Sequence, residues 1–278
     1  MMLREHHVKL GPVRTRYFEG GNPLGPTVVL VHEGGYGGDA PNTYGRLVER
    51  LADEYHLVLP EMLGFGGTDK AVFFGENPYE PRLRHLAAFL DALDLRDAHF
   101  VGNSFGGGMV LRLSIREETS WRMRSATSIS GTGGPFRTAE ALKELAEYLP
   151  SVEDARRIDG WILPPGAEDE DHAEARFESS LRPGQWESMM APTLRSPVPS
   201  EQPRSWDFPA ALSQSVVPTL LVAGTLDRML EKGWEALLAE HLKDVQVVHL
   251  ETGHSPNISH PLDTANVLLD FFNHIDGR

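Results

Sequence analysis

The chain has 278 residues, none of them cysteine, and its 40 acidic and 26 basic side chains give a formal net charge of -14. This acidic balance argues against non-specific binding to nucleic acid or to anionic membrane surfaces. The lack of cysteine excludes disulfides, thiol catalysis and cysteine-based metal sites. Residues 1–7 lack the apolar stretch of a signal peptide, and no segment approaches the roughly 20 apolar residues of a membrane-spanning helix. We therefore expect a soluble, cytoplasmic protein.

Short apolar runs alternate with segments of helical periodicity along most of the chain. Two runs that flank a Gly-Pro pair predict an antiparallel hairpin over residues 8–10 and 13–17. Later strands are expected within residues 28–31, 57–59, 100–101, 126–129, 220–222 and 245–250. Helices are expected within residues 44–52, 81–93, 107–115, 234–242 and 262–272. The alternation predicts an α/β fold with a mostly parallel sheet of about eight strands and helices on both faces.

Residues 134–210 interrupt this alternation. They contain helix-like pieces, proline clusters and an acidic run at 168–171, but no strand-like run. Their large apolar side chains are sufficient for a folded unit, and they include Trp161, Phe177, Trp186, Met189, Met190 and Trp206. We therefore predict a helical cap over 134–210, inserted into a core made of residues 1–133 and 211–278. The cap is expected to cover the carboxyl edge of the sheet.

Ser104 is the candidate nucleophile, because it lies in the sequence Gly-Asn-Ser-Phe-Gly directly after an apolar strand and before a helical segment. This is the G-x-S-x-G nucleophile elbow in its expected context. The glycines allow a turn that is too tight for larger side chains, and the strained turn projects the hydroxyl from the end of the sheet. A glycine-rich turn without catalytic function could have the same five residues, so the interpretation depends on partners elsewhere in the chain.

Asp227 and His254 are the expected partners of Ser104. A serine hydroxyl needs an adjacent base, and that base needs a carboxylate that orients it. Both residues follow later strands and therefore lie at the same sheet edge as the serine, in the order nucleophile, acid, histidine. Asp227 could instead cap a helix or lie in a surface turn, with Glu231 or Glu251 as the acid.

A second glycine-rich turn, residues 31–38, follows the strand at 28–31. Ester or ketone hydrolysis passes through an oxyanion that needs backbone N–H donors. The expected donors are the amides of Phe105 and Gly34. A phosphate-binding loop is excluded, because neither G-x-x-x-x-G-K-[ST] nor a helix-opening G-x-G-x-x-G is present. His32 is interpreted as structural, and with no H-E-x-x-H motif we expect neither a metal nor a cofactor.

With these three elements in order, the chain resembles the α/β-hydrolases over nearly its whole length. More narrowly, it is similar to the meta-cleavage-product hydrolases, serine enzymes that split a carbon–carbon bond in vinylogous 1,5-diketones derived from aromatic rings. The resemblance rests on GNSFGG at 102–107, the glycine-rich turn after His32, PEMLGFG at 60–66 and RFESSLRPG at 176–184. The first three signals are shared with many esterases, and the fourth discriminates better.

The resemblance implies a substrate with a carboxylate beside a dienol, held by an arginine through paired hydrogen bonds. It points to Arg176 for this role, then to Arg182. Asn103 and Asn42 are candidates for binding the enol or keto oxygens. Each has a structural alternative, since the arginines could pair with cap acids, Asn103 could serve the elbow and Asn42 could cap a helix. After the dienol becomes a ketone, Ser104 or an activated water would attack the carbonyl.

Two residues depart from the family pattern. Glu33 stands where family members usually have a small residue, and Ser255 stands where several have tryptophan. A carboxylate beside the oxyanion hole would repel an anionic substrate unless it points into the protein. A carboxylesterase or lactonase with the same triad therefore remains an alternative, as do a perhydrolase and a non-catalytic ligand-binding α/β-hydrolase. The expected partner is a small-molecule substrate, and the sequence is compatible with a homo-oligomer.

Overall fold

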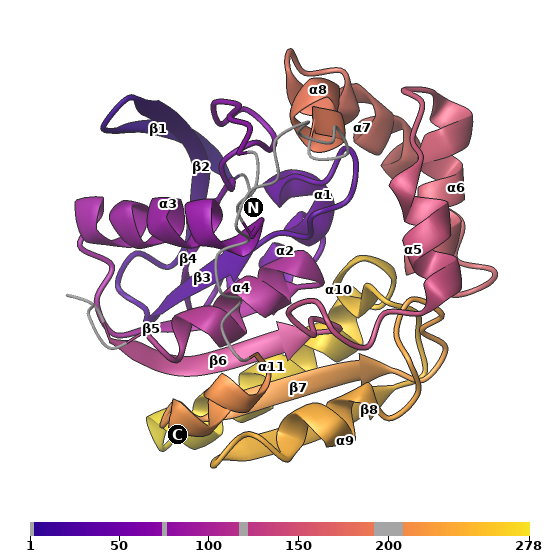
Figure 1. The fold of residues 1–278 in the computed structure, drawn as a ribbon. Coiled ribbons are helices and arrows are strands. Elements are labelled where there is room, and N and C mark those ends of the chain that lie inside the picture. The colour runs from indigo at the N-terminus through magenta and orange to yellow at the C-terminus, as the bar shows by residue number, and fades with distance from the viewer. Residues whose placement is uncertain (1–2, 74–76, 117–121, 192–207) are drawn as a thin grey trace.

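The computed structural model describes residues 3–73, 77–116, 122–191 and 208–278. An eight-stranded sheet lies at its centre, with the strand order β1-β2-β4-β3-β5-β6-β7-β8 (Figure 1). The strands are β1 (Arg4–Leu10), β2 (Val13–Gly21), β3 (Thr27–Val31), β4 (His56–Pro60), β5 (Ala98–Asn103), β6 (Met123–Ile129), β7 (Thr219–Gly224) and β8 (Val245–Leu250).

The strand directions confirm a mostly parallel α/β sheet. The predicted hairpin is present as β1 and β2, in which Leu10 pairs with Val13, and β2 continues antiparallel to β4. All later neighbours are parallel, including β3 with β5 and β5 with β6. Because parallel strands end at one edge, the loops after β3, β5, β7 and β8 meet there.

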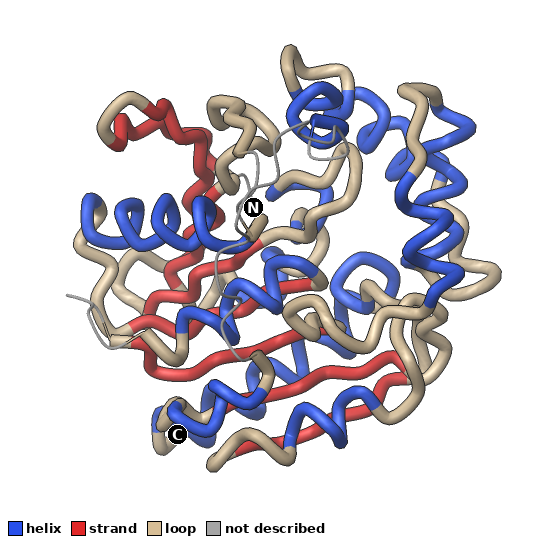
Figure 2. The backbone as a smooth tube through the Cα atoms, in the orientation of Figure 1, coloured by secondary structure: helices blue, strands red, loops and turns tan. Residues whose placement is uncertain are grey.

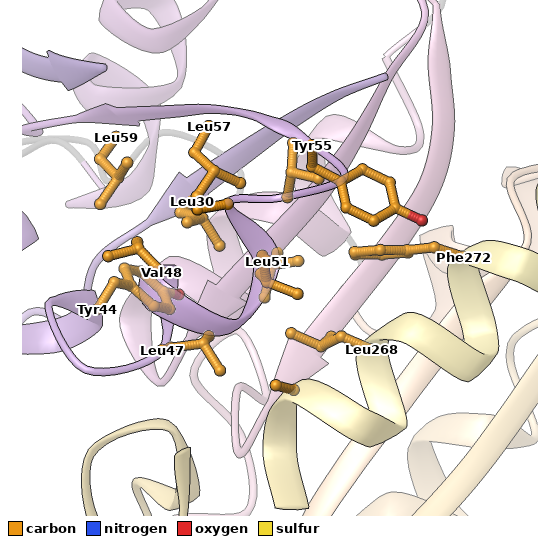
Figure 3. Close-up of a cluster of buried hydrophobic side chains, with 14 of the residues drawn as sticks. Leu30, Tyr44, Leu47, Val48, Leu51, Tyr55, Leu57, Leu59, Leu268 and Phe272 are labelled. Carbon is orange, nitrogen blue, oxygen red and sulfur yellow. The ribbon is translucent and has the colours of Figure 1, made fainter. Parts of the chain in front are cut away.

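Helices cover both faces of the sheet, as Figure 2 shows for the strands in red between helices in blue. They are α1 (Ala40–Tyr44), α2 (Val48–Leu51), α3 (Tyr79–Ala92), α4 (Phe105–Leu113), α9 (Trp234–Ala239), α10 (Pro256–Ser259) and α11 (Pro261–Asp276). Alternate residues of β3 point to opposite faces. Val29 and Val31 pack with α3 and α4, whereas Val28 and Leu30 pack with α1, α2 and α11 (Figure 3). Burial on both faces explains why this strand is a continuous apolar run.

The helix expected over 44–52 is divided into two short helices. Asp39 caps the first, since its carboxylate accepts a hydrogen bond from the Asn42 amide at 2.9 Å. The first helix therefore begins before the predicted segment, and the chain turns between Gly45 and Leu47 before the second helix starts. This turn lets Tyr44 and Leu47 pack on the same sheet face.

Between β6 and β7 the described residues form four α-helices, α5 (Ala139–Ala146), α6 (Val152–Ile162), α7 (Glu170–Ser180) and α8 (Gln185–Met190), and a short 3-10 helix, η2 (Ala210–Gln214). In Figure 1, α5 and α6 stand beyond the carboxyl ends of β6 and β7. Residues 192–207, including Trp206, lie outside the described residues, so the cap boundaries 134–210 remain a prediction. Within the described ranges, no helix is long and apolar enough to cross a membrane.

Candidate active site

Ser104 occupies the turn between β5 and α4 with φ 55° and ψ -116°. A positive φ is unfavourable for a side-chain-bearing residue, so the surrounding hydrogen bonds must hold the turn. The Ser104 amide donates to Ile129 O at 2.8 Å, and the Gly108 amide donates to Ser104 O at 3.1 Å. A side chain at Gly106 would collide with Val31 O, which explains the glycine. Both neighbouring strands thus fix the position of the serine.

The side chains of Ser104, His254 and Asp227 form one hydrogen-bonded line. His254 Nε2 lies 2.8 Å from Ser104 Oγ, and His254 Nδ1 lies 2.8 Å from Asp227 Oδ2. Because a carboxylate can only accept, Nδ1 carries the proton and Nε2 is the acceptor for the hydroxyl. The Met229 amide donates to the other carboxylate oxygen of Asp227 at 2.7 Å, and the His254 side chain is buried. The arrangement leaves an unprotonated ring nitrogen beside the alcohol.

Asn103, predicted as a substrate ligand, instead joins β5 to the loop that carries His254. Its side chain is fully buried and donates to Ile129 O at 3.2 Å and to His254 O at 3.3 Å. Its carbonyl oxygen accepts from the Ser255 hydroxyl at 3.1 Å. Ser255, one of the two departures from the family pattern, therefore helps to position the histidine loop.

Gly34 and Phe105, the predicted oxyanion donors, both line a cavity with Ser104. A Cβ built on Gly34 would lie 2.7 Å from Phe105 Cβ, so these two segments are in direct contact. Phe105 is the first residue of α4, and the first amides of a helix have no partner within the helix. They also carry the positive end of the helix dipole, which suits an oxyanion.

The cavity has a volume of about 170 Å³. One wall is formed by the sheet edge, with Gly34, Ser104, Phe105 and His254. The opposite wall comes from α5, α6 and α8 and is apolar, with side chains of Leu145, Ile158, Ile162 and Met189. Ser104 is therefore enclosed between the sheet edge and the helices that follow β6.

Arg176, predicted to bind the substrate carboxylate, is not among the lining residues. Its guanidinium is buried, and Nη1 donates to Glu33 Oε1 at 2.9 Å and to Tyr36 O at 2.7 Å. Nε donates to Asp159 Oδ1 at 2.8 Å. Burial alone would lower the pKa of Arg176, but the charges of Glu33 and Asp159 raise it. Two of its nitrogens are thus held by protein carboxylates, whereas Nη2 is buried without a hydrogen-bond partner among the described residues.

Glu33 lines the cavity, yet its charge is compensated. One carboxylate oxygen accepts from Arg176, and the other accepts from the Gly35 amide. The adjacent His32 donates from Nδ1 to Glu33 O at 2.6 Å and accepts from the Met62 amide at Nε2 at 3.0 Å. Burial lowers the pKa of His32, so it stays neutral and structural, as the sequence indicated.

The other two predicted ligands also lie outside the lining set. Asn42 donates to Gly37 O at 3.1 Å and to Ala175 O at 3.3 Å, which joins the glycine-rich turn to α7. Arg182 follows α7 and does not reach the cavity wall. In the part of the chain that the structure describes, no group of three or more His, Asp and Glu residues could hold a metal ion.

Arg137 lines the cavity and was missed by sequence reasoning. It lies between β6 and α5, directly before Thr138, the N-cap of α5. The sequence did contain a signal for Arg137. The loops after the parallel strands all lie at the sheet edge that carries Ser104, and Arg137 is in one of these loops. The loop after β6 was expected to begin the cap, so Arg137 was not among the predicted site residues.

Comparison with known proteins gives consistent relationships. The sequence model of the alpha/beta hydrolase family matches residues 28–267. The chain is 28% identical over 271 residues to 2-hydroxymuconate semialdehyde hydrolase from Pseudomonas sp. strain CF600, covering 95% of this chain and 92% of the relative. It is 31% identical over 217 residues to 2-hydroxy-6-oxo-2,4-heptadienoate hydrolase from Pseudomonas putida, covering 76% and 74%. A mutant of the meta-cleavage product hydrolase from Pseudomonas fluorescens IP01 has a TM-score of 0.82 at 26% identity, with 97% of each chain covered.

Proposed function

Because this chain belongs to the alpha/beta hydrolase family, we propose that it is a serine hydrolase with the triad Ser104, His254 and Asp227. The observation that carries the proposal is the pair of 2.8 Å hydrogen bonds linking the three side chains. His254 Nε2 takes the hydroxyl proton as Ser104 Oγ attacks a carbonyl carbon, and the carboxylate stabilises the imidazolium. The amides of Gly34 and Phe105 stabilise the resulting oxyanion.

For the substrate we propose a vinylogous 1,5-diketone of the 2-hydroxy-6-oxo-dienoate type, cleaved between C5 and C6. The names of the two relatives above specify such compounds, which supports this choice. The volume of the cavity further restricts the range of proposed substrates. At about 170 Å³, the cavity is smaller than the roughly 300–1,000 Å³ of common ligand pockets. A small group on C6, such as hydrogen or methyl, therefore fits the proposal better than an aryl group.

The proposed reaction begins with ketonisation of the dienol, in which the C2 hydroxyl loses its proton and C5 gains one. Ser104 Oγ, or a water deprotonated by His254, then adds to the C6 carbonyl. Collapse of the tetrahedral intermediate breaks the C5–C6 bond, and its electron pair passes into a dienolate that receives the proton held by His254. In the acyl-enzyme route, water attacks the ester with His254 as base. The products are a carboxylic acid and a 2-hydroxydienoate.

A carboxylesterase or lactonase is the second candidate, and a specific observation favours it. The arginine expected to hold a substrate carboxylate is engaged by Glu33 and Asp159 and does not line the cavity. An ester substrate would need no such contact, and the same triad would perform ordinary acyl transfer.

The test compares kcat/KM for 2-hydroxy-6-oxo-hepta-2,4-dienoate with kcat/KM for p-nitrophenyl acetate. We expect the dienoate to be preferred by orders of magnitude, and Ser104→Ala to abolish both activities. If p-nitrophenyl acetate were preferred by a similar factor, the protein would be an esterase and not a carbon–carbon bond hydrolase. If neither compound is turned over and a fluorophosphonate does not label Ser104, the protein is a non-catalytic member of the family.

A further inference from the structure

Among the described residues that line the cavity, Arg137 is the one arginine, and no described residue compensates its charge. Within residues 3–73, 77–116, 122–191 and 208–278, its side chain forms no hydrogen bond or ion pair. The side chain is half-buried. The carboxylate in the same wall, Glu33, is satisfied by Arg176 and the Gly35 amide. A half-buried cation that faces an enclosed cavity without a counter-ion is electrostatically incomplete.

The neighbouring arginines differ from Arg137 in this respect. Arg176 pairs with two carboxylates. Arg112 stacks on Tyr79, at 4.3 Å from the ring centroid, and donates to Gly133 O at 2.6 Å. Arg82 donates from Nε to the carbonyl oxygen of residue 63 at 3.0 Å. Their guanidinium groups serve the fold, whereas that of Arg137 has no such role in the described structure.

The backbone at Arg137 is held firmly, although its side chain has no partner among the described residues. Arg137 forms an antiparallel bridge with Leu230, in the loop after β7. On either side, the Thr138 amide donates to Met229 O at 3.0 Å and the Glu231 amide donates to Phe136 O at 2.8 Å. We name this paired stretch, residues 136–138 with 229–231, the clasp. It fixes the point from which the guanidinium extends, and such pre-organisation lowers the cost of binding.

Arg137 and Phe105 line the same cavity. The positive charge of Arg137 acts on Tyr79, where it opposes the burial that raises the pKa of that phenol. Tyr79 stacks on Phe105 at 4.4 Å between ring centroids. Arg137 therefore shares the cavity with the first residue of α4 and with apolar side chains of α5, α6 and α8.

We propose that Arg137 binds the carboxylate of the substrate and thereby selects substrates with an anionic end. This inference rests on the proposed hydrolase function, and it assigns to Arg137 the contact that the resemblance had implied for Arg176. A guanidinium matches the two oxygens of a carboxylate through parallel hydrogen bonds. The attraction is stronger in an enclosed apolar cavity than in water. The carboxylate supplies the missing counter-ion while Ser104 attacks the carbonyl at the other end of the molecule.

The first test uses two esters with the same leaving group, mono-p-nitrophenyl glutarate and p-nitrophenyl pentanoate, of which only the glutarate has a carboxylate. For Arg137→Met we expect the ratio of kcat/KM, glutarate over pentanoate, to fall roughly 10- to 100-fold, mostly through KM. Arg137→Lys should recover part of the ratio, because lysine restores the positive charge but cannot form the two parallel hydrogen bonds of a guanidinium. The matched control is Arg46→Met, which removes an exposed arginine paired with Asp169 and should leave the ratio unchanged. An unchanged ratio in Arg137→Met overturns the inference.

The second test needs no turnover, so its failure is distinct from failure of the proposed function. In Ser104→Ala, calorimetry compares the binding of hexanoate with that of hexanamide, which has similar size but no charge. We expect hexanoate to bind about tenfold more tightly or better, and Arg137→Met in the same background to abolish the difference. Equal affinities in Ser104→Ala overturn the inference, even if the wild-type protein hydrolyses dienoates. If hexanoate binds more tightly than hexanamide but the wild-type protein shows no hydrolysis, the anion site is supported and the proposed reaction is contradicted.

Discussion

The nucleophile side of the cavity and the side that faces helices α5–α8 are held together by different interactions. On the nucleophile side, Ser104 is fixed by one backbone hydrogen bond to β6, by another within α4 and by a glycine turn. On the helix side, the contacts that matter are buried charges from distant parts of the chain, since Glu33 and Arg176 are separated by 143 positions. A local motif therefore places the reacting group, whereas long-range charge pairing determines which arginine remains available to a substrate.

The largest expected effect is on the nucleophile side. Ser104→Ala should lower kcat on the order of 10⁶-fold, because the triad acts as a unit. The melting temperature should not fall, since the hydroxyl contacts His254 alone among the residues described and the smaller side chain fits the elbow. Steady-state kinetics and thermal melts measure the two effects. A variant that retains more than about a tenth of the wild-type rate would contradict the triad.

Asp227→Asn should have the next largest effect, on the order of 10⁴-fold in kcat. The amide can present its NH₂ to His254 Nδ1, so the ring would favour the tautomer with its proton on Nε2, beside the serine. Kinetics across pH provides the measurement. If Glu231→Gln had the larger effect instead, the acid would be misassigned, and that variant is the matched control because the residue lies in the same loop.

Arg176→Met tests the helix side, and its effect should be on stability. Removing one partner of a buried ion pair typically costs about 3–5 kcal/mol, because the remaining charge is left uncompensated. Here Glu33 and Asp159 would both lose a donor. Denaturant unfolding measures the loss. A variant as stable as wild type, but with a raised KM for the dienoate, would return Arg176 to the role of substrate ligand and remove the contrast between the two sides.

The smallest effect concerns pH and His85, a buried histidine of α3. Burial, and then the charge of Arg82, lower the pKa of His85 to about 4. Because the unfolded value is about 6.5, the unfolded chain binds the proton first as the pH falls. The contribution is therefore complete above about pH 6.5 and is lost towards about pH 4, on the order of 3 kcal/mol. Unfolding curves of His85→Gln should show a smaller loss between pH 7 and 5 than wild type. If His85→Gln and the wild-type protein lost the same stability over this range, groups other than His85 would cause the acid sensitivity.

Much of the nucleophile side could be predicted from the sequence, because its signals are local. The elbow needs only five residues between a strand and a helix, and the topology of a parallel sheet brings the loops with Asp227 and His254 to the same edge. The structure places His254 within hydrogen-bond distance of both Ser104 and Asp227, and the catalytic roles of these residues belong to the proposed function.

The helix side could not be predicted in the same way. Arg176 and Arg137 are both arginines near the sheet edge, and no local pattern distinguishes a paired guanidinium from a free one. The distinction depends on Glu33, which the sequence analysis noted without a partner, and on Asp159, which it did not single out. The division of the helix over 44–52 has a similar origin, because the sheet face determines how Tyr44 and its neighbours pack.

The clasp limits where helices α5–α8 can be exchanged with those of a related hydrolase in a chimaeric protein. One of its two backbone stretches lies directly before α5, and the other lies in the loop after β7, just after Asp227. A chimaera that imports the helices α5–α8 of another hydrolase at residue 139 would keep the native partner for each stretch. A junction placed a few positions earlier would put foreign backbone against the loop that holds the acid, and the transplanted molecule would lose rate even if every reacting group were native.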